Sequence, residues 1–187
     1  MDCPEISEKD AHIWLVLSPP DRLKENNIGL LENITKCGEV IVITVSQPSK
    51  YLSELYASRG IPVEKITFID TISKFAMGSV ESGASKTRFI NNPSDLTGLS
   101  IAVSETIKDM MDKKPSIVID SINAMLIYLP STDITKFMHF ITSKLRIMDL
   151  SGIYIAAESS LDPKIMAQIV TFTDKVINLN GDNMPKQ

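Results

Sequence analysis

Cysteine and histidine are scarce in this sequence of 187 residues, which contains two of each. Cys3 and Cys37 are too few for a disulfide framework, and they form no C-x-x-C pair of the kind that binds zinc. His12 and His139 lie far apart in the chain, so neither is expected to bind a metal. The shortage of cysteine favours a reducing compartment, and we therefore expect a cytoplasmic protein without a metal centre.

Long hydrophobic runs are missing as well, and so is an excess of positive charge. No apolar run approaches the roughly 18 residues that a membrane helix needs, and the polar residues 1–5 are unlike a secretory signal. The net charge of -4 gives nucleic acid no general attraction, so neither a membrane nor a nucleic acid is the expected partner. With 43% hydrophobic and 22% charged residues, the composition is that of one globular domain, residues 1–187.

Six short apolar runs predict the strands of a sheet. Several of them are continuous and rich in β-branched residues, as residues 40–45 are. Continuous apolar runs are typical of strands buried on both faces, as in a parallel sheet that is covered by helices. The predicted strands span residues 13–17, 40–45, 65–69, 116–119, 152–156 and 175–179.

The segments between these strands have the spacing and the end signals of helices. Apolar residues such as Ile28 and Leu31 fall on one helix face, and Ser94 or Asp95 is a plausible first residue of a later helix. The predicted helices span residues 27–37, 49–58, 95 to about 112, 134–148 and 161–171. The alternation of strand and helix predicts an α/β fold with a three-layer, doubly wound, mostly parallel sheet.

Two segments lie outside this pattern. Residues 71–93 are rich in Ser, Gly and Asn, show no clear periodicity, and are long for a connection inside a compact domain. They predict a loop, either a lid or docking surface or a solvated linker around a short helix. Residues 181–187 have the character of a tail, which leaves a core at about residues 13–180.

The segment 18–25, Ser-Pro-Pro-Asp-Arg-Leu-Lys-Glu, stands where a phosphate-binding loop would stand, between the first strand and the first helix. On the template G-x-x-x-x-G-K-[ST], Lys24 takes the place of the lysine. Ser18 and Leu23 replace the two glycines, and Glu25 replaces the hydroxyl residue that binds magnesium. The segment therefore has the position of a Walker A loop and a degenerate sequence.

Each of these replacements removes a physical requirement for holding phosphate. Glycine lets successive backbone N–H groups converge on phosphate oxygens, whereas Pro19 and Pro20 have no N–H to donate. Glu25 adds a negative charge beside a polyphosphate. We predict that this loop does not bind ATP in the usual way, and the alternative is a plain strand-to-helix turn with Lys24 in solvent.

Acidic residues follow three of the predicted strands. Asp120, with Ser121 after it, ends the apolar strand 116–119 and gives a Walker B-like pattern, in which the carboxylate normally holds magnesium. Asp70 and Glu158 stand at equivalent strand ends, at the edge where open α/β sheets bind ligands. A cation site there, with Asp120 as the first candidate, is one interpretation, and helix caps or water ligands are the other.

The ordered series of elements resembles the RecA/KaiC-like ATPase superfamily, particularly the single-domain KaiC-like proteins common in archaea. The segments that carry the resemblance are residues 38–46, 53–61, 66–70, 117–124, 153–158 and 174–179. The resemblance implies a P-loop NTPase fold with the strand order 3-2-4-5-1-6, numbering the six predicted strands along the chain. It also implies that a catalytic glutamate belongs just after the second strand, where this chain reads Ser46-Gln47-Pro48. Gln47 can position a water molecule but cannot accept its proton as a carboxylate does.

These departures lead to the hypothesis of a pseudo-ATPase, a regulatory or scaffold protein that binds no cofactor and is not an enzyme. Its expected partner is another protein or a second copy, bound through a RecA-like surface. The alternative is an atypical ATPase or nucleotide sensor that binds ATP and magnesium through Lys24, Asp120 and Glu158. A DNA-repair accessory role is a third hypothesis, and the acidic balance gives it no support.

Overall fold

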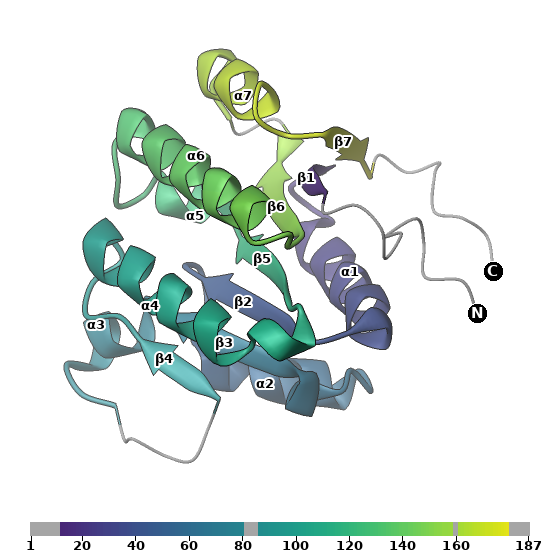
Figure 1. Cartoon of the computed structure of the whole chain (residues 1–187). Coiled ribbons are helices and arrows are strands. Elements are labelled where there is room, and N and C mark those ends of the chain that lie inside the picture. The colour runs from purple at the N-terminus through teal and green to yellow at the C-terminus, as the bar shows by residue number, and fades with distance from the viewer. Residues whose placement is uncertain (1–11, 81–85, 159–160, 180–187) are drawn as a thin grey trace.

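The computed structural model describes residues 12–80, 86–158 and 161–179, and in these ranges the chain forms a three-layer α/β sandwich (Figure 1). Seven strands make one sheet, and every strand pair in it is parallel. The strands are β1 (Ile13–Ser18), β2 (Val40–Thr44), β3 (Ile66–Asp70), β4 (Thr87–Phe89), β5 (Ser116–Asp120), β6 (Gly152–Ala157) and β7 (Lys175–Asn178). Their order across the sheet is β4-β3-β2-β5-β6-β1-β7.

Seven helices connect the strands. They are α1 (Leu23–Cys37), α2 (Ser49–Ser58), α3 (Ser73–Met77), α4 (Leu96–Asp109), α5 (Ile122–Met125), α6 (Ser131–Ile147) and α7 (Pro163–Val170). Short 3₁₀ turns lie at Val63–Lys65 and Met111–Lys113. None of the helices in the described ranges combines the length and the apolarity needed to cross a bilayer.

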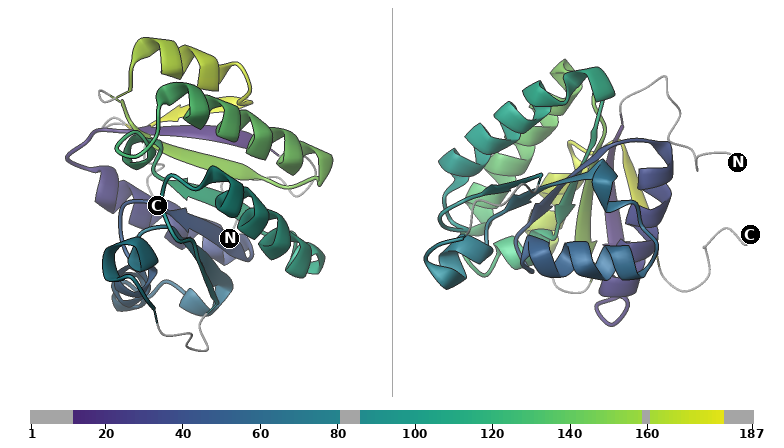
Figure 2. Two further views of the ribbon diagram at one scale, coloured as in Figure 1. Left: turned by 90° about the vertical axis from the view of Figure 1, so that its left-hand side faces the viewer. Right: turned by 90° about the horizontal axis from the view of Figure 1, so that it is seen from below.

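The sheet divides the core into two parts because successive strand residues point to opposite faces. On β1, Trp14 and Val16 pack with buried residues of α1 and α2, whereas Ile13, Leu15 and Leu17 pack with those of α4, α6 and α7. The right-hand view of Figure 2 shows the two helical layers on opposite sides of the sheet. Both faces are therefore covered, as the continuous apolar runs predict.

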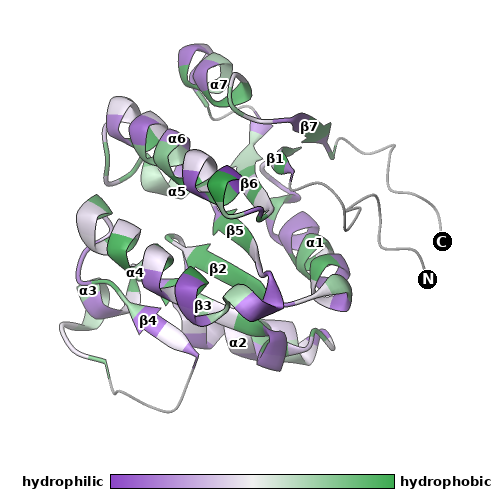
Figure 3. Ribbon diagram, in the orientation of Figure 1, coloured by the Kyte–Doolittle hydropathy of each residue, from purple (hydrophilic) through white to green (hydrophobic). Residues whose placement is uncertain are grey.

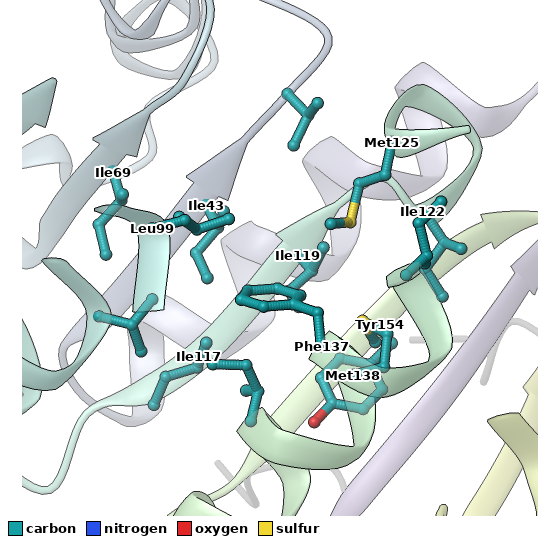
Figure 4. Packing of buried hydrophobic residues seen from close by; sticks show 14 of the residues in the cluster. Ile43, Ile69, Leu99, Ile117, Ile119, Ile122, Met125, Phe137, Met138 and Tyr154 are labelled. Carbon is teal, nitrogen blue, oxygen red and sulfur yellow. The ribbon is translucent and has the colours of Figure 1, made fainter. Parts of the chain in front are cut away.

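The middle strands carry the most hydrophobic surface. Every residue of β2 is buried, and Figure 3 shows β2 as hydrophobic while the edge strand β4 is mainly hydrophilic. On the α6 side, the ring of Phe137 lies among Ile117, Ile119 and Met138 (Figure 4). The core is therefore centred on β2, β5 and the helices that cross them.

The fold class is as predicted, and the six expected strands keep the expected order. The difference is an additional strand, β4, which with α3 lies inside the segment 71–93 that the sequence predicts as a loop. Three residues are too few to show a strand pattern. Instead, β4 is fixed by its neighbours: Phe68 N–H donates to Lys86 O, and Arg88 forms ion pairs with two acidic residues of α4. The predicted tail, 181–187, lies outside the described residues.

Helix ends differ by a few residues from those predicted. Helix α1 begins at Leu23 rather than at residue 27, and α4 ends at Asp109 rather than near residue 112, where a 3₁₀ turn replaces it. The predicted cap Asp95 is present, since its Oδ1 accepts from the N–H of Gly98 at 2.8 Å. These shifts leave the packing faces of the helices unchanged.

Truncating the buried face of α6 tests this packing. Leu145 is fully buried against the sheet, whereas Ile147 on the same helix is 85% exposed. We expect Leu145→Ala to lower the free energy of unfolding by about 2–5 kcal/mol, because it leaves a cavity. The matched change Ile147→Ala should cost less than about 0.5 kcal/mol. Urea unfolding followed by circular dichroism measures both, and equal losses would contradict the orientation of α6.

Candidate functional site

The predicted site residues gather at one edge of the sheet because parallel strands all end there. The turns after β1, β2, β3, β5 and β6 meet at this edge, each leading toward a helix. The contacts made by the individual side chains, however, divide these residues into separate groups. Lys24 belongs to one such group, with α2, and Asp120 belongs to another, with α1.

The turn after β1 is closed on itself. The Ser18 side chain is fully buried; its hydroxyl donates to Pro19 O at 3.1 Å and accepts from Asn26 Nδ2 at 2.8 Å. The N–H of Arg22 is used within the turn, where it donates to Pro19 O at 3.0 Å. Pro19 and Pro20 have no N–H, so the turn before α1 has few backbone donors of its own, while the first N–H groups of α1 have no capping side chain.

The residues at the lysine and hydroxyl positions of the motif contact α2. Lys24 Nζ donates to the hydroxyl of Tyr51 at 3.0 Å and lies 5.6 Å from the centre of that ring. Glu25 forms a two-bond ion pair with Arg59, with both N–O distances 3.0 Å. Leu23 packs against the apolar cluster under α1 and α2. Together these contacts form a surface clamp between α1 and α2.

Asp120 is buried at the end of β5 and has a partner that the sequence did not reveal. Its Oδ1 accepts from Nδ2 of Asn27 on α1 at 2.9 Å, and both residues are buried. Burial raises the pKa of Asp120 to about 6, and the hydrogen bond from Asn27 offsets part of that rise. Burial and, second, the charge of Asp120 raise the pKa of Tyr56. Ser121, also buried, follows Asp120 through a cis peptide bond.

The only local signal for Asn27 is its position as a polar residue beside Ile28 on the buried face of a predicted helix. Buried amides are usually hydrogen-bonded, so such a residue implies a partner. The partner itself lies 93 positions away in the chain, and nothing local identifies it. The sequence also missed Asn123, whose Oδ1 accepts from the N–H of Ala157 at 2.7 Å and so joins α5 to β6.

Asp70, at the end of β3, is a helix cap. It is fully buried and accepts from the N–H groups of Ser49, Ile72 and Ser73 and from the Ser73 hydroxyl, at 2.6–2.9 Å. Helices α2 and α3 begin after Pro48 and Ile72, and neither residue supplies a capping side chain. Asp70 therefore caps both helices. Burial opposes its charge, but the hydrogen bonds from Ser49 and Ser73 outweigh burial and lower the pKa of Asp70.

Gln47 follows β2 and Glu158 follows β6 at the carboxyl edge of the sheet. Gln47 is exposed, and its carbonyl oxygen accepts from the Thr44 hydroxyl at 2.6 Å. Glu158 follows β6 and accepts from Asn178 Nδ2 of β7 at 2.8 Å. Because β5 lies between β2 and β6, the structure does not bring Gln47 and Glu158 together. Among the described residues, no group of three or more His, Cys, Asp and Glu is arranged to hold a metal ion.

Two cavities lie away from the carboxyl edge of the sheet. A groove of about 580 Å³ runs between α4 and α6, and a smaller one of about 410 Å³ between α6 and α7 contains His139. Neither is lined by a residue of the turn after β1. The carboxyl edge is therefore a region of hydrogen-bonded contacts rather than one of these two hollows.

The buried charge of Asp120 gives a testable dependence of stability on pH. Its pKa is higher in the folded chain than the ordinary value of 3.8, so the carboxyl favours folding most below about pH 4. This contribution is lost as the pH rises through about 6. Asp120→Asn keeps an acceptor for Asn27 without the charge. Urea unfolding should therefore show it to be more stable than the wild type near pH 7.5, by up to about 3 kcal/mol, and similar near pH 4. The same difference in unfolding free energy between Asp120→Asn and the wild type at pH 4 and pH 7.5 would contradict a raised pKa of Asp120.

The contribution of Asp70 to stability should depend on pH in the opposite sense to that of Asp120. Its lowered pKa stabilises the fold above the ordinary pKa of 3.8, and this contribution is lost as the pH falls through the lower folded value. Asp70→Asn places an NH₂ group among N–H donors, and we expect it to cost roughly 2–5 kcal/mol at neutral pH. Asp95→Asn is the matched control, since Asn caps a helix as well as Asp does and should cost less than about 0.5 kcal/mol. Equal urea midpoints for the two variants would exclude Asp70 as a double cap.

Comparisons with known proteins agree with the fold. A KaiC-like protein, PH0186, from the hyperthermophilic archaeon Pyrococcus horikoshii OT3 has 15% identity and a TM-score of 0.62, covering 94% of this chain and 74% of its own. An uncharacterized protein, PH0321, from Pyrococcus horikoshii, solved in complex with an unknown peptide, has 12% identity and a TM-score of 0.70. That match covers 91% of this chain and 78% of the other. At such identities the likeness establishes the RecA/KaiC-like fold alone.

The sequence comparisons give a family without a function. No curated protein matches the chain significantly. The model of a family of unknown function, DUF7504, matches residues 29–179, a span that begins within α1, after the turn that follows β1, and ends just beyond β7. This chain, with its KaiC-like fold, therefore belongs to the DUF7504 family.

Proposed function

We propose that this protein is a RecA/KaiC-like domain that does not turn over ATP and that acts as a regulatory or scaffold protein. The observation that carries the proposal is the clamp between α1 and α2. Lys24 and Glu25, at the two motif positions that would meet phosphate and magnesium, are engaged with Tyr51 and Arg59 instead. A domain that hydrolyses ATP needs both side chains, or their equivalents, at the nucleotide.

The fit of the site to ATP and magnesium is poor on three further grounds. The turn after β1 contains two prolines and uses the Arg22 N–H internally. Glu25 would bring a carboxylate to a polyphosphate that already carries several negative charges. Gln47 cannot accept a proton from an attacking water molecule. We therefore assign no step of catalysis to this edge.

The alternative, a nucleotide sensor with a remodelled site, receives less support. It requires Lys24, Asp120 and Glu158 to face one ligand. Their hydrogen bonds run to α2, α1 and β7, respectively. A nucleotide would have to break several of these contacts before it could bind.

A role in binding other proteins is supported from two sides. One neighbour of this fold, PH0321, was solved in complex with an unknown peptide. In this chain, several large apolar side chains remain exposed, among them Ile101, Ile127 and Phe140. Exposed apolar surface of this kind is typical of interaction sites.

Nucleotide binding and hydrolysis test the proposal directly. We expect isothermal titration with ATP and magnesium at about 1 mM to give no saturable heat, and steady-state ATP hydrolysis to stay at background. Lys24→Ala should leave both results unchanged, because its amine is held by Tyr51. Asp120→Ala is the second control: turnover above background that this change abolishes would overturn the proposal.

A further inference from the structure

The groove between α4 and α6 is a candidate binding surface on the face of the sheet opposite to α1 and α2. The two helices lie side by side over that face in both Figures 1 and 2. The groove has a volume of about 580 Å³, and the residues that decide its character are Leu96, Ile101, Glu105, Lys136, Phe137 and Phe140. It lies between helices whose inner faces are already packed on the sheet.

Two apolar residues of this groove, Ile101 and Phe140, are exposed and lie outside the buried core. Helix α4 buries Leu99, Val103 and Ile107, and α6 buries a full stripe that includes Met138 and Leu145. On the solvent side of the two helices, Ile101 is 55% exposed and Phe140 is 44% exposed. Ile147 lies two helical turns beyond Phe140. Phe137 forms a fixed floor, with its ring held against β5 (Figure 4).

The shape of the groove favours a helix as its occupant. Two neighbouring helices on a sheet present ridges of side chains with a furrow between them, and a third helix fits such a furrow by the same packing. An amphipathic helix binds in this way through apolar residues spaced at i, i+3 or i+4, and i+7. Ile101 and Phe140 provide one wall each, and Phe137 provides the base.

The charges around the groove favour an acidic occupant, although the chain as a whole has a net charge of -4. The two acidic residues of the lining are each in an ion pair: Asp133 pairs with Lys136 at 3.6 Å, and Glu105 pairs at 2.8 Å with Arg88, which also pairs with Asp109 at 2.6 Å. Beyond them, Lys144 lies over the ring of Phe140, 5.9 Å from its centre. Lys108 lies on α4 two turns after Ile101 and is exposed. These two lysines lie beyond the lining itself, and with Arg88 and Lys136 they give four basic side chains around the groove against three acidic ones, Glu105, Asp109 and Asp133.

We propose that this groove binds an amphipathic helix of a partner protein, with apolar anchors against Ile101, Phe137 and Phe140 and acidic residues facing Lys108 and Lys144. The proposal gives the scaffold role its partner class and rests on that role. The groove residues are separate from the carboxyl edge, so the groove proposal and the pseudo-ATPase proposal can be tested independently.

A pair of designed peptides tests the groove. The probe is a fluorescein-labelled amphipathic helix of about 18 residues with leucines at the anchor spacing and glutamates on the flanks, and its match has lysines in place of the glutamates. Fluorescence anisotropy should show the acidic peptide binding at least about tenfold more tightly. Phe140→Ser and Ile101→Ser should each weaken it by about tenfold or more. Lys144→Glu should reduce the preference for the acidic peptide.

A control variant distinguishes the groove from the rest of the apolar surface. Ile127→Ser removes a side chain that is 75% exposed just after α5, outside the groove, and should leave binding unchanged. Equal affinity for the two peptides, or no effect of Phe140→Ser, would overturn the proposal. A dimer in sedimentation equilibrium that Phe140→Ser dissociates would also overturn it, because a second copy would then be the occupant. ATP turnover, measured separately, would sink the pseudo-ATPase proposal and leave a positive peptide result standing.

Discussion

The buried hydrogen bond between Asn27 and Asp120 fixes the first helix against the middle of the sheet, and the geometry of the carboxyl edge depends on it. Asp120 ends the strand that lies between β2 and β6, so its position is set by pairing on both sides. Asn27 lies one turn after Leu23, and the bond ties the first turns of α1 to the end of β5, beside the apolar packing of Ile28 and Leu31. Once α1 is held there, Lys24 and Glu25 reach Tyr51 and Arg59.

At the carboxyl edge of this RecA/KaiC-like sheet, many of the polar groups are engaged with other parts of the chain. In open α/β sheets that bind a ligand, strand ends and helix starts present polar groups to it. Here such groups bind other parts of the chain: Asp70 caps two helices, Asn123 of α5 binds the end of β6, and Ser18 closes its own turn. Hydrogen bonds that would otherwise go to a ligand or to water instead hold neighbouring elements together.

Much of the fold could be predicted from the sequence, and the reason is physical. A strand buried on both faces must be apolar along its whole length, so β2 and β5 appear directly as runs such as residues 40–45. By contrast, β4 has three residues, pairs with β3 and forms ion pairs with α4. No local sequence pattern indicates these long-range contacts. The end of α4 was also set by context, because a 3₁₀ turn takes over after Asp109.

The positions of these polar residues at the carboxyl edge could be predicted from the sequence, and their contacts could not. Strand ends give the edge at which Asp70, Asp120 and Glu158 lie, and the capping role of Asp70 was one of the alternatives that the sequence left open. Which groups each residue meets is a long-range matter: Ser49 comes 21 positions before Asp70, and Asn27 comes 93 before Asp120. Only the three-dimensional arrangement pairs them.

The short edge strand β4 has a consequence for the behaviour of the protein in solution. Arg88 of this strand is anchored by Glu105 and Asp109, at 2.8 and 2.6 Å, so its side chain is held against α4. An unpaired border normally invites the backbone of another molecule to add to it, which leads to aggregation. An edge strand of three residues offers an incoming strand few backbone groups with which to pair. This edge of the sheet is therefore a poor template for pairing with a strand of another molecule.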